Sequence, residues 1–249
     1  MTFVSGQTLA VDGARCEHCS LHSRCLAMGL EGEQLAGFDA LLKRPRPLKR
    51  GEVLVHQGDR FSNLYAVRTG SLKQVQVHGD ARDQVTHFYL PGELVGLDGI
   101  GSGECAGNVV ALESTYVCEL PFLQLEALMQ DSHTLQHRLF RSMGEELRDH
   151  QRMMCLLSGR TADQRMASFL LGLSERFRLR GYSPSCFYLS MSRGDIGSYL
   201  GLAIETVSRV LGRFQLQELI SLEGRQVSLE AMESLKRMAA EGAGRHSGS

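Results

Sequence analysis

Hydrophobic and polar positions change their spacing along the chain, and each change predicts a different kind of element. Residues 30–43 carry leucine and phenylalanine at helical spacing, which predicts a short amphipathic helix. Residues 51–121 hold short β-rich runs separated by glycines, a pattern typical of an antiparallel sandwich or barrel. Residues 122–158 return to a helical pattern with no proline. We therefore expect two domains joined by one long helix.

One face of the long helical segment repeats at intervals of three and four residues. The repeated positions are Leu139, Met143, Leu147, His150, Met154 and Leu157. This spacing is close to 3.5 residues, which favours a helix that pairs with another helix. The repeat lasts fewer than three heptads, so both a symmetric dimer and a core helix packed on the barrel remain open.

Residues 193–215, RGDIGSYLGLAIETVSRVLGRFQ, fit two helices that meet through a tight turn. Gly197 is the small residue where the helices cross, and Gly201 adopts a left-handed turn conformation at little cost. The residues expected in the shared core are Ile196, Leu200, Leu202, Val207 and Val210. A small hairpin is expected to follow, turning at Glu223 and Gly224. The pattern favours a DNA-binding helix-turn-helix over a plain pair of helices.

The second of these helices carries side chains suited to base edges in a DNA major groove. They are Glu205, Thr206, Ser208 and Arg209, with Arg213 one turn further on and better placed for phosphate. Arg209 can pair with guanine, and Glu205 can accept a hydrogen bond from a cytosine amine. An acid on a DNA-facing helix opposes binding electrostatically, so Glu205 favours sequence-specific recognition.

Charge and composition agree with a DNA partner only weakly. The 249 residues carry a net charge of −1, but residues 160–249 carry +3 and residues 1–159 carry −4. The first thirty residues lack the pattern of a secretory signal, and no apolar run reaches membrane-spanning length. We therefore expect a cytoplasmic protein whose seven cysteines are mostly reduced.

Three of the cysteines are clustered near the N-terminus. Cys16, Cys19 and Cys25 form the pattern C-x₂-C-x₅-C, with His18 and His22 between them. Thiophilic metals usually take four ligands, so one ligand is missing from this cluster. The spacing leaves zinc, an iron–sulfur cluster and a redox thiol site open. A histidine of the cluster could complete a zinc site, although an exposed loop histidine is the more common case.

A β-barrel, a long helix and a helix-turn-helix together resemble the CRP/FNR superfamily of bacterial transcription regulators. The resemblance runs from about Arg15 to Leu229 and is carried by GELVGLDGIGSG, YVCELPF, the helix-turn-helix segment and the cysteine cluster. Members that bind cyclic AMP have an arginine soon after a Gly-Glu-Leu motif. This chain keeps Gly92, Glu93 and Leu94 but has no arginine in the following VGLDGIGSGECAGN. A cyclic phosphate would lack its charged partner, so no cyclic nucleotide effector is expected.

The cysteine cluster is similar to that of FNR-type oxygen sensors, which hold a [4Fe–4S] cluster through three N-terminal cysteines and one from the barrel. The resemblance implies Cys16, Cys19, Cys25 and Cys118 as ligands. Residue chemistry alone does not choose Cys118 over Cys105, and the family match favours Cys118. Cys105, Cys155 and Cys186 have no matching family role.

The resemblance also implies a mechanism. The anaerobic dimer would bind a palindromic TTGAT-N₄-ATCAA-like site through Glu205, Ser208 and Arg209, and would activate or repress genes of anaerobic metabolism. Oxygen would convert the cluster to [2Fe–2S] and release the DNA. Residues 78–84 are a candidate contact with RNA polymerase. His150 departs from the family, where aspartate is common at this seam position.

The expected fold is α+β, with an N-terminal antiparallel β-roll or barrel sensor domain, a long dimerisation helix and a C-terminal winged helix-turn-helix. The expected boundaries are 1–29 for the cysteine-rich arm, 30–130 for the β-barrel, 131–159 for the dimerisation helix, 160–240 for the DNA-binding domain and 241–249 for a disordered tail. No enzyme is expected, because nucleotide fingerprints and catalytic spacings are lacking. The alternative is a regulator of the same superfamily that responds to another signal, with zinc or redox thiols at the cysteines.

Overall fold

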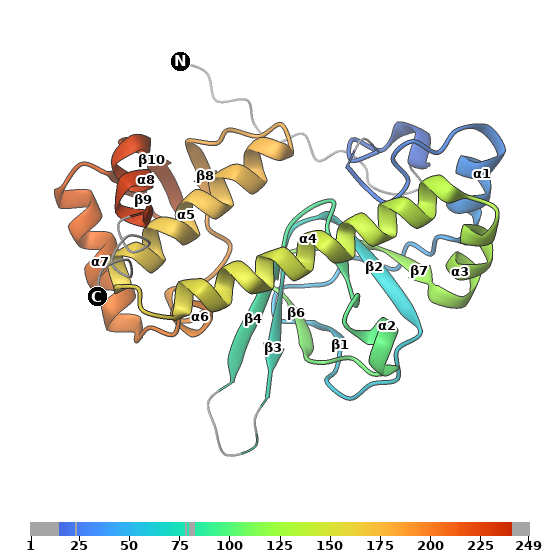
Figure 1. Ribbon diagram of the computed structural model, residues 1–249, viewed down its shortest axis with the longest axis horizontal. Coiled ribbons are helices and arrows are strands. Elements are labelled where there is room, and N and C mark those ends of the chain that lie inside the picture. The colour runs from blue at the N-terminus through green and yellow to red at the C-terminus, as the bar shows by residue number, and fades with distance from the viewer. Residues whose placement is uncertain (1–14, 23, 78, 80–82, 241–249) are drawn as a thin grey trace, which may run out of the picture.

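A computed structural model describes residues 15–240 except 23, 78 and 80–82, and it has the expected α+β architecture (Figure 1). The arm contains a short 3₁₀ helix, η1 (Cys16–His18), and leads into α1 (Gly32–Leu41). The rest of the arm before residue 15 and the tail expected at 241–249 lie outside the described residues. None of the described helices is long and apolar enough to cross a membrane.

The β-roll consists of two antiparallel sheets, as the alternating pattern predicts. Its elements are β1 (Val53–Val55), β2 (Asn63–Thr69), β3 (Leu72–Gln76), β4 (Gln84–Tyr89), β5 (Leu94–Val95), the short helix α2 (Gly99–Ser102), β6 (Asn108–Ala111) and β7 (Tyr116–Pro121). The strand orders are β1-β6-β3-β4 and β5-β2-β7. Pairing of β2 with β7 sets Ala66 opposite Cys118. An isolated bridge adds Lys43 beside Glu119, so the chain after α1 is tied to β7 next to Cys118.

The helical pattern over 122–158 forms two helices, and the long helix expected at 131–159 corresponds to the second of them. The structure has α3 (Phe122–Gln130) and α4 (His133–Leu157). Between them, Ser132 takes an extended conformation, and its hydroxyl accepts a hydrogen bond from Leu135 N at 3.4 Å. A serine at this position caps the new helix, and it provides a local reason for the break.

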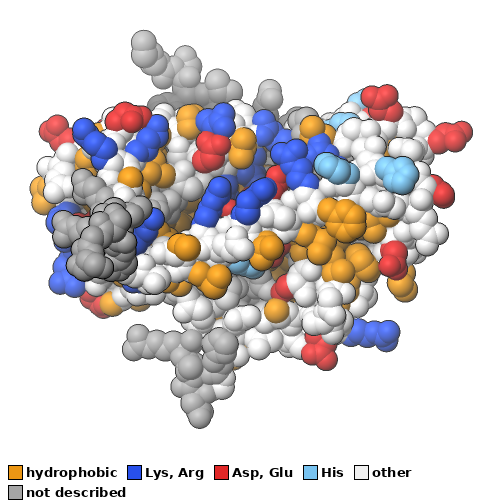
Figure 2. All heavy atoms as spheres, viewed as in Figure 1, with side chains coloured by type: hydrophobic (Ala, Val, Ile, Leu, Met, Phe, Trp, Pro, Cys, Tyr) orange, Lys and Arg blue, Asp and Glu red, His pale blue; other side chains and the backbone are white. Residues whose placement is uncertain are grey.

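The exposed apolar stripe of α4 differs from the expected seam at its first position. Leu139 is only 5% exposed and packs inside its own chain, whereas the next residue, Phe140, is 68% exposed. The exposed stripe is therefore Phe140, Met143, Leu147, His150, Met154 and Leu157. These positions step by three and four residues, which is the coiled-coil spacing. Apolar side chains follow the line of α4 across this face of the molecule (Figure 2).

The C-terminal part has the expected winged helix-turn-helix. It comprises α5 (Ala162–Leu179), β8 (Cys186–Tyr188), α6 (Arg193–Leu200), α7 (Ile204–Leu216), β9 (Ile220–Glu223), β10 (Gln226–Leu229) and α8 (Met232–Ala240). The hairpin β9–β10 turns at Gly224 and Arg225, one residue later than predicted, because Glu223 still pairs with Gln226. β8 completes a three-stranded wing. Leu189 N donates to Arg225 O at 2.8 Å, so the turn lies beside the segment that leads into α6.

This part packs directly on the β-roll, and the two share one apolar core. Phe88 of β4 lies with its ring centroid 4.9 Å from that of Tyr199 in α6 and 6.1 Å from that of Phe169 in α5. Val85 N donates to Ser198 Oγ at 2.8 Å, and Lys73 forms an ion pair with Asp195 at the start of α6. The β3–β4 hairpin is thus docked on the helix-turn-helix.

Two ion pairs that share Glu93 also join the β-roll to the C-terminal part. Arg176 Nε and Nη2 donate to the two oxygens of Glu93 at 3.0 and 2.6 Å, and Arg180 also donates to Glu93. Leu90 N donates to the same carboxylate at 2.8 Å. Burial alone would raise the pKa of Glu93, but the two guanidiniums lower it to about 2. Glu93 is therefore ionised at neutral pH and clamps α5 to the loop after β4.

Glu93→Gln is expected to destabilise the folded chain by about 3 kcal/mol, because it leaves two largely buried guanidiniums without their carboxylate. Urea unfolding at pH 7 measures the change. The control is Glu175→Gln, which breaks the Glu175–Arg178 pair on the same helix, where both side chains are more than half exposed. Equal small effects of the two substitutions would contradict a structural role for the clamp.

Candidate metal centre and DNA interface

The arm presents its cysteines from successive hydrogen-bonded turns. Cys19 N donates to Cys16 O at 3.2 Å, and Cys25 N donates to Leu21 O at 2.8 Å. Leu26 and Leu30 follow and are almost fully buried. These apolar residues anchor the arm to the β-roll, in the same apolar cluster as Cys16 and Cys25.

The structure brings Cys118 into the neighbourhood of the three arm cysteines. Cys16, Cys25 and Cys118 pack in one apolar cluster. The thiols also interact electrostatically, Cys118 with both Cys25 and Cys19. Within the described residues, no three His, Cys, Asp or Glu side chains converge as closely as a metal requires. The four thiols are thus neighbours, at separations wider than those of a closed ligand set.

Cys105 lies elsewhere, in the loop before β6. Its backbone N–H donates to Asp59 O at 2.9 Å, and its O accepts from Gly58 N at 2.9 Å. Its thiol lines a separate cavity with Asp59 and Tyr65 and interacts electrostatically with Asp59 and Asp98. The rival fourth cysteine is therefore surrounded by carboxylates rather than by thiols.

Burial controls the chemistry of the thiols. It raises the pKa of Cys16 and of Cys25, and it raises the pKa of Cys118 to about 11. These cysteines are therefore neutral thiols at physiological pH in the absence of a compensating cation. Ligation of a metal would release their protons, as is usual for thiolate sites.

The two histidines of the arm differ in their surroundings. His18 is exposed, as expected for a loop histidine. His22 is half-buried, and its Nε2 is a buried nitrogen without a hydrogen-bond partner among the described residues. A polar atom buried in this way normally has a partner, so His22 marks a place where a further group is expected to sit.

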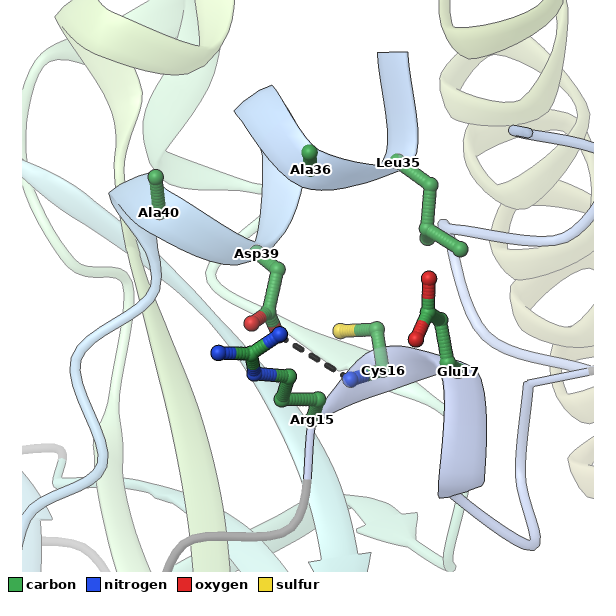
Figure 3. A pocket seen from close by; sticks show the side chains of 7 residues that line it. All are labelled: Arg15, Cys16, Glu17, Leu35, Ala36, Asp39 and Ala40. Atoms are coloured by element: carbon green, nitrogen blue, oxygen red, sulfur yellow. Dashed lines mark hydrogen bonds between the residues drawn. The ribbon is translucent and has the colours of Figure 1, made fainter. Parts of the chain in front are cut away.

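An ion pair beside Cys16 is the part of the site that sequence reasoning missed. Asp39 Oδ1 accepts a hydrogen bond from Cys16 N at 3.0 Å (Figure 3). Arg44 donates to the same oxygen. Arg44 Nη2 also lies 4.0 Å from Cys16 Sγ. In the sequence, Asp39 looks like a surface residue of an amphipathic helix and Arg44 like part of the basic run KRPRP. No local pattern distinguishes them.

The helix-turn-helix has the local structure that its glycines require. Gly201 has a φ of +63° at the end of α6. A Cβ at Gly197 would lie 2.6 Å from Leu202 O, so the helices could not cross as closely with a larger residue. Ser192 and Asp195 form a capping box at the start of α6. Ile196, Leu200, Val207 and Val210 are buried as expected, with Leu202 packed against them.

The start of α7 faces away from the protein. Glu205, Ser208 and Arg209 are exposed, and Thr206 accepts a hydrogen bond from Arg209 Nη2 at 3.3 Å. Arg213 is also exposed, but it forms an ion pair with Asp163 of α5. A DNA phosphate would have to compete with that carboxylate for Arg213, which the sequence did not indicate.

Comparisons with known proteins cover most of the chain. Residues 164–238 match the family described as "Crp-like helix-turn-helix domain", and residues 45–132 match "Cyclic nucleotide-binding domain". The chain is 50% identical over 216 residues to "Transcriptional activator protein Anr" of Pseudomonas protegens, covering 87% of this chain and 88% of the relative. It is 39% identical over 224 residues to "Fumarate and nitrate reduction regulatory protein" of Escherichia coli, covering 90% of each.

Among solved structures, FixK2 from Bradyrhizobium japonicum is similar, with a TM-score of 0.72 and 29% identity. The match covers 79% of this chain and 96% of FixK2.

Proposed function

The chain belongs to the FNR-type transcription regulators of the CRP/FNR superfamily, and we propose that it is the oxygen-responsive kind, which binds a palindromic DNA site as a dimer. Its relatives are transcription regulators and not enzymes. The observation that supports oxygen sensing is the neighbourhood of Cys118 and the three arm thiols. A protein that acts on chromosomal DNA works in the cytoplasm.

The residues present fit a [4Fe–4S] cluster. Four cysteines are the usual ligands of such a cluster, and the apolar surroundings of Cys16 and Cys25 suit its burial. Cys16, Cys19, Cys25 and Cys118 would hold it, and the unpartnered Nε2 of His22 offers a polar neighbour. When bound, the cluster would supply iron–sulfur bonds that react with oxygen.

The packing of the arm suggests how a change in the position of the arm would be transmitted to α4, the proposed dimer helix. Arg138 of α4 donates to Met28 O of the arm at 3.3 Å. Leu135 and Leu139 of α4 pack in the same apolar cluster as Cys16. Movement of the arm would therefore shift the first turns of α4, and the exposed stripe begins at the adjacent Phe140. In this proposal the buried Leu139 links the arm to α4 and does not contact the partner chain.

The exposed stripe of α4 favours a homodimer. A row of large apolar side chains at coiled-coil spacing is costly to leave in water. A symmetric dimer would present two copies of α7 about one DNA turn apart, which suits a TTGAT-N₄-ATCAA-like palindrome. Depending on its position in a promoter, the bound dimer would activate or repress genes of anaerobic metabolism.

Two further partner proposals concern the β-roll. RNA polymerase is proposed to contact residues 78–84, of which 78 and 80–82 lie outside the described residues. A cyclic nucleotide is not proposed as effector. Glu93, the carboxylate retained from the nucleotide-binding motif, already has Arg176 and Arg180 as partners.

Cys118→Ser is expected to abolish the iron–sulfur chromophore, whereas Cys105→Ser is expected to leave it intact, since Cys105 lies apart from the arm thiols. The wild-type chain, purified without air, should be straw-brown with broad absorption near about 420 nm. Iron and acid-labile sulfide per chain are measured with the spectrum. A colourless wild-type chain with one bound zinc would contradict the proposal and favour the zinc alternative.

Arg209→Ala is expected to weaken binding to the palindrome by about tenfold or more and to relax discrimination at one base pair. Arg209→Lys keeps the charge but loses the planar guanidinium. It should therefore retain most of the affinity for unrelated DNA and lose more of the discrimination between matched and mismatched sites. Fluorescence anisotropy with matched and single-mismatch duplexes measures both. The control is Arg178→Ala on α5. If both Arg209 variants discriminate between matched and mismatched duplexes as well as wild type does, Arg209 does not read a base.

His150→Asp is expected to weaken dimerisation of the metal-free chain by about tenfold, because two carboxylates would face each other across the seam. Sedimentation velocity measures the association. An unchanged association constant in His150→Asp, or a wild-type metal-free chain that is monomeric, would contradict this prediction.

A further inference from the structure

We propose that Asp39 and Arg44 are positioning residues for the thiol site: together they hold Cys16 beside the strand that carries Cys118, and the Arg44 guanidinium places positive charge near the Cys16 sulfur. This inference rests on the proposed iron–sulfur function. It assigns two residues outside the ligand set, on α1 and in the segment that follows it.

Asp39 is held in place by the packing of α1. The helix buries Leu35 and Phe38 in the apolar cluster beneath the arm, so the last turn, which carries Asp39, has a fixed position. The carboxylate of Asp39 faces η1 and accepts the backbone N–H of Cys16 at 3.0 Å (Figure 3). This N–H is at the start of a short 3₁₀ helix and would otherwise lack an intrahelical partner. Asp39 therefore fixes the first ligand residue relative to α1.

Arg44 is held from the opposite side, by β7. The preceding residue, Lys43, exchanges two backbone hydrogen bonds with Glu119, at 3.0 Å and 2.8 Å. Glu119 is the neighbour of Cys118 on the strand. The guanidinium of Arg44 then donates to Asp39, lies 4.0 Å from Cys16 Sγ and interacts electrostatically with Cys118. Arg44 thus contacts Cys16 of the arm from a segment whose preceding residue is bonded to the neighbour of Cys118 on β7.

The charge of Arg44 has a physical role at such a site. Four thiolates bring more negative charge than the cluster core brings positive charge, and their apolar surroundings make this excess costly. The Arg44 guanidinium, with a donor directed at the Cys16 sulfur, offsets part of this excess, while the adjacent Asp39 carboxylate opposes it. The Asp39 carboxylate keeps the guanidinium oriented.

The next arginine along the chain offers a matched comparison. Arg46 also forms an ion pair, with Glu52, but its side chain is 68% exposed, against 27% for Arg44. An exposed pair of this kind contributes little to a folded protein. Substitution of Arg46 removes the same charge two residues away, so it controls for net charge and for the basic run.

The experiment compares full-length wild type with Arg44→Gln, Arg44→Lys and Arg46→Gln, all reconstituted without air with iron and sulfide. The rate at which a chelator removes iron anaerobically is measured for each. Thermal unfolding of the metal-free chains is recorded in parallel. We expect Arg44→Gln to lose iron about tenfold faster than wild type, as is usual for residues that support metal ligands. Arg44→Lys should recover most of that loss, and Arg46→Gln should match wild type.

Equal rates for wild type and Arg44→Gln would overturn the inference. So would an Arg44→Gln chain whose metal-free form unfolds at a clearly lower temperature than that of Arg44→Lys, because the effect would then be one of folding. Failure of the wild type itself to take up iron and sulfide would instead overturn the proposed function. The two failures are therefore distinguishable.

Discussion

Burial of the arm against the β-roll is the interaction on which the thiol site depends. The described part of the arm has only the short helix η1 and turns, and Leu26 and Leu30 anchor it in an apolar cluster with β2, β7, α1 and α4. Because that cluster contains both Cys16 and Cys118, packing of leucines also brings together thiols that are far apart in the chain. The same cluster includes Leu135 and Leu139 of α4. The position of the arm and the position of α4 are thus parts of one packing arrangement.

A second constraint joins the β-roll to the DNA-binding part. The Glu93 carboxylate, with Arg176 and Arg180, lies beside a shared apolar core formed by Phe88, Phe169 and Tyr199. A carboxylate that belongs to a nucleotide-binding motif in related proteins here has partners from its own chain. The helix-turn-helix is therefore attached to the sensor domain by both packing and charge. Signals that move α4 would act on a DNA-binding part already held by the β-roll.

Local patterns were sufficient for much of the fold. Strand alternation predicted the antiparallel β-roll, and the glycines at 197 and 201 with their apolar neighbours predicted the helix-turn-helix, because these features are set by backbone geometry and nearest neighbours. The same patterns misplaced one seam residue. Leu139 and Phe140 are both apolar, and spacing alone does not decide which of two adjacent residues faces the core of the chain. The expected start of the long helix at residue 131 lies next to the observed cap at Ser132, although a helical pattern runs on both sides of it.

The amino-acid sequence by itself determined the element types, the helix-turn-helix with polar residues at the start of its second helix, and the presence of three clustered cysteines near the N-terminus. The tertiary structure decided which distant groups meet. It set Cys118 rather than Cys105 near the arm thiols, gave Asp39 and Arg44 their place beside Cys16, and paired Arg213 with Asp163. The physical reason is that these contacts join segments tens of residues apart. Their formation depends on how whole sheets and helices pack, and no local periodicity records it.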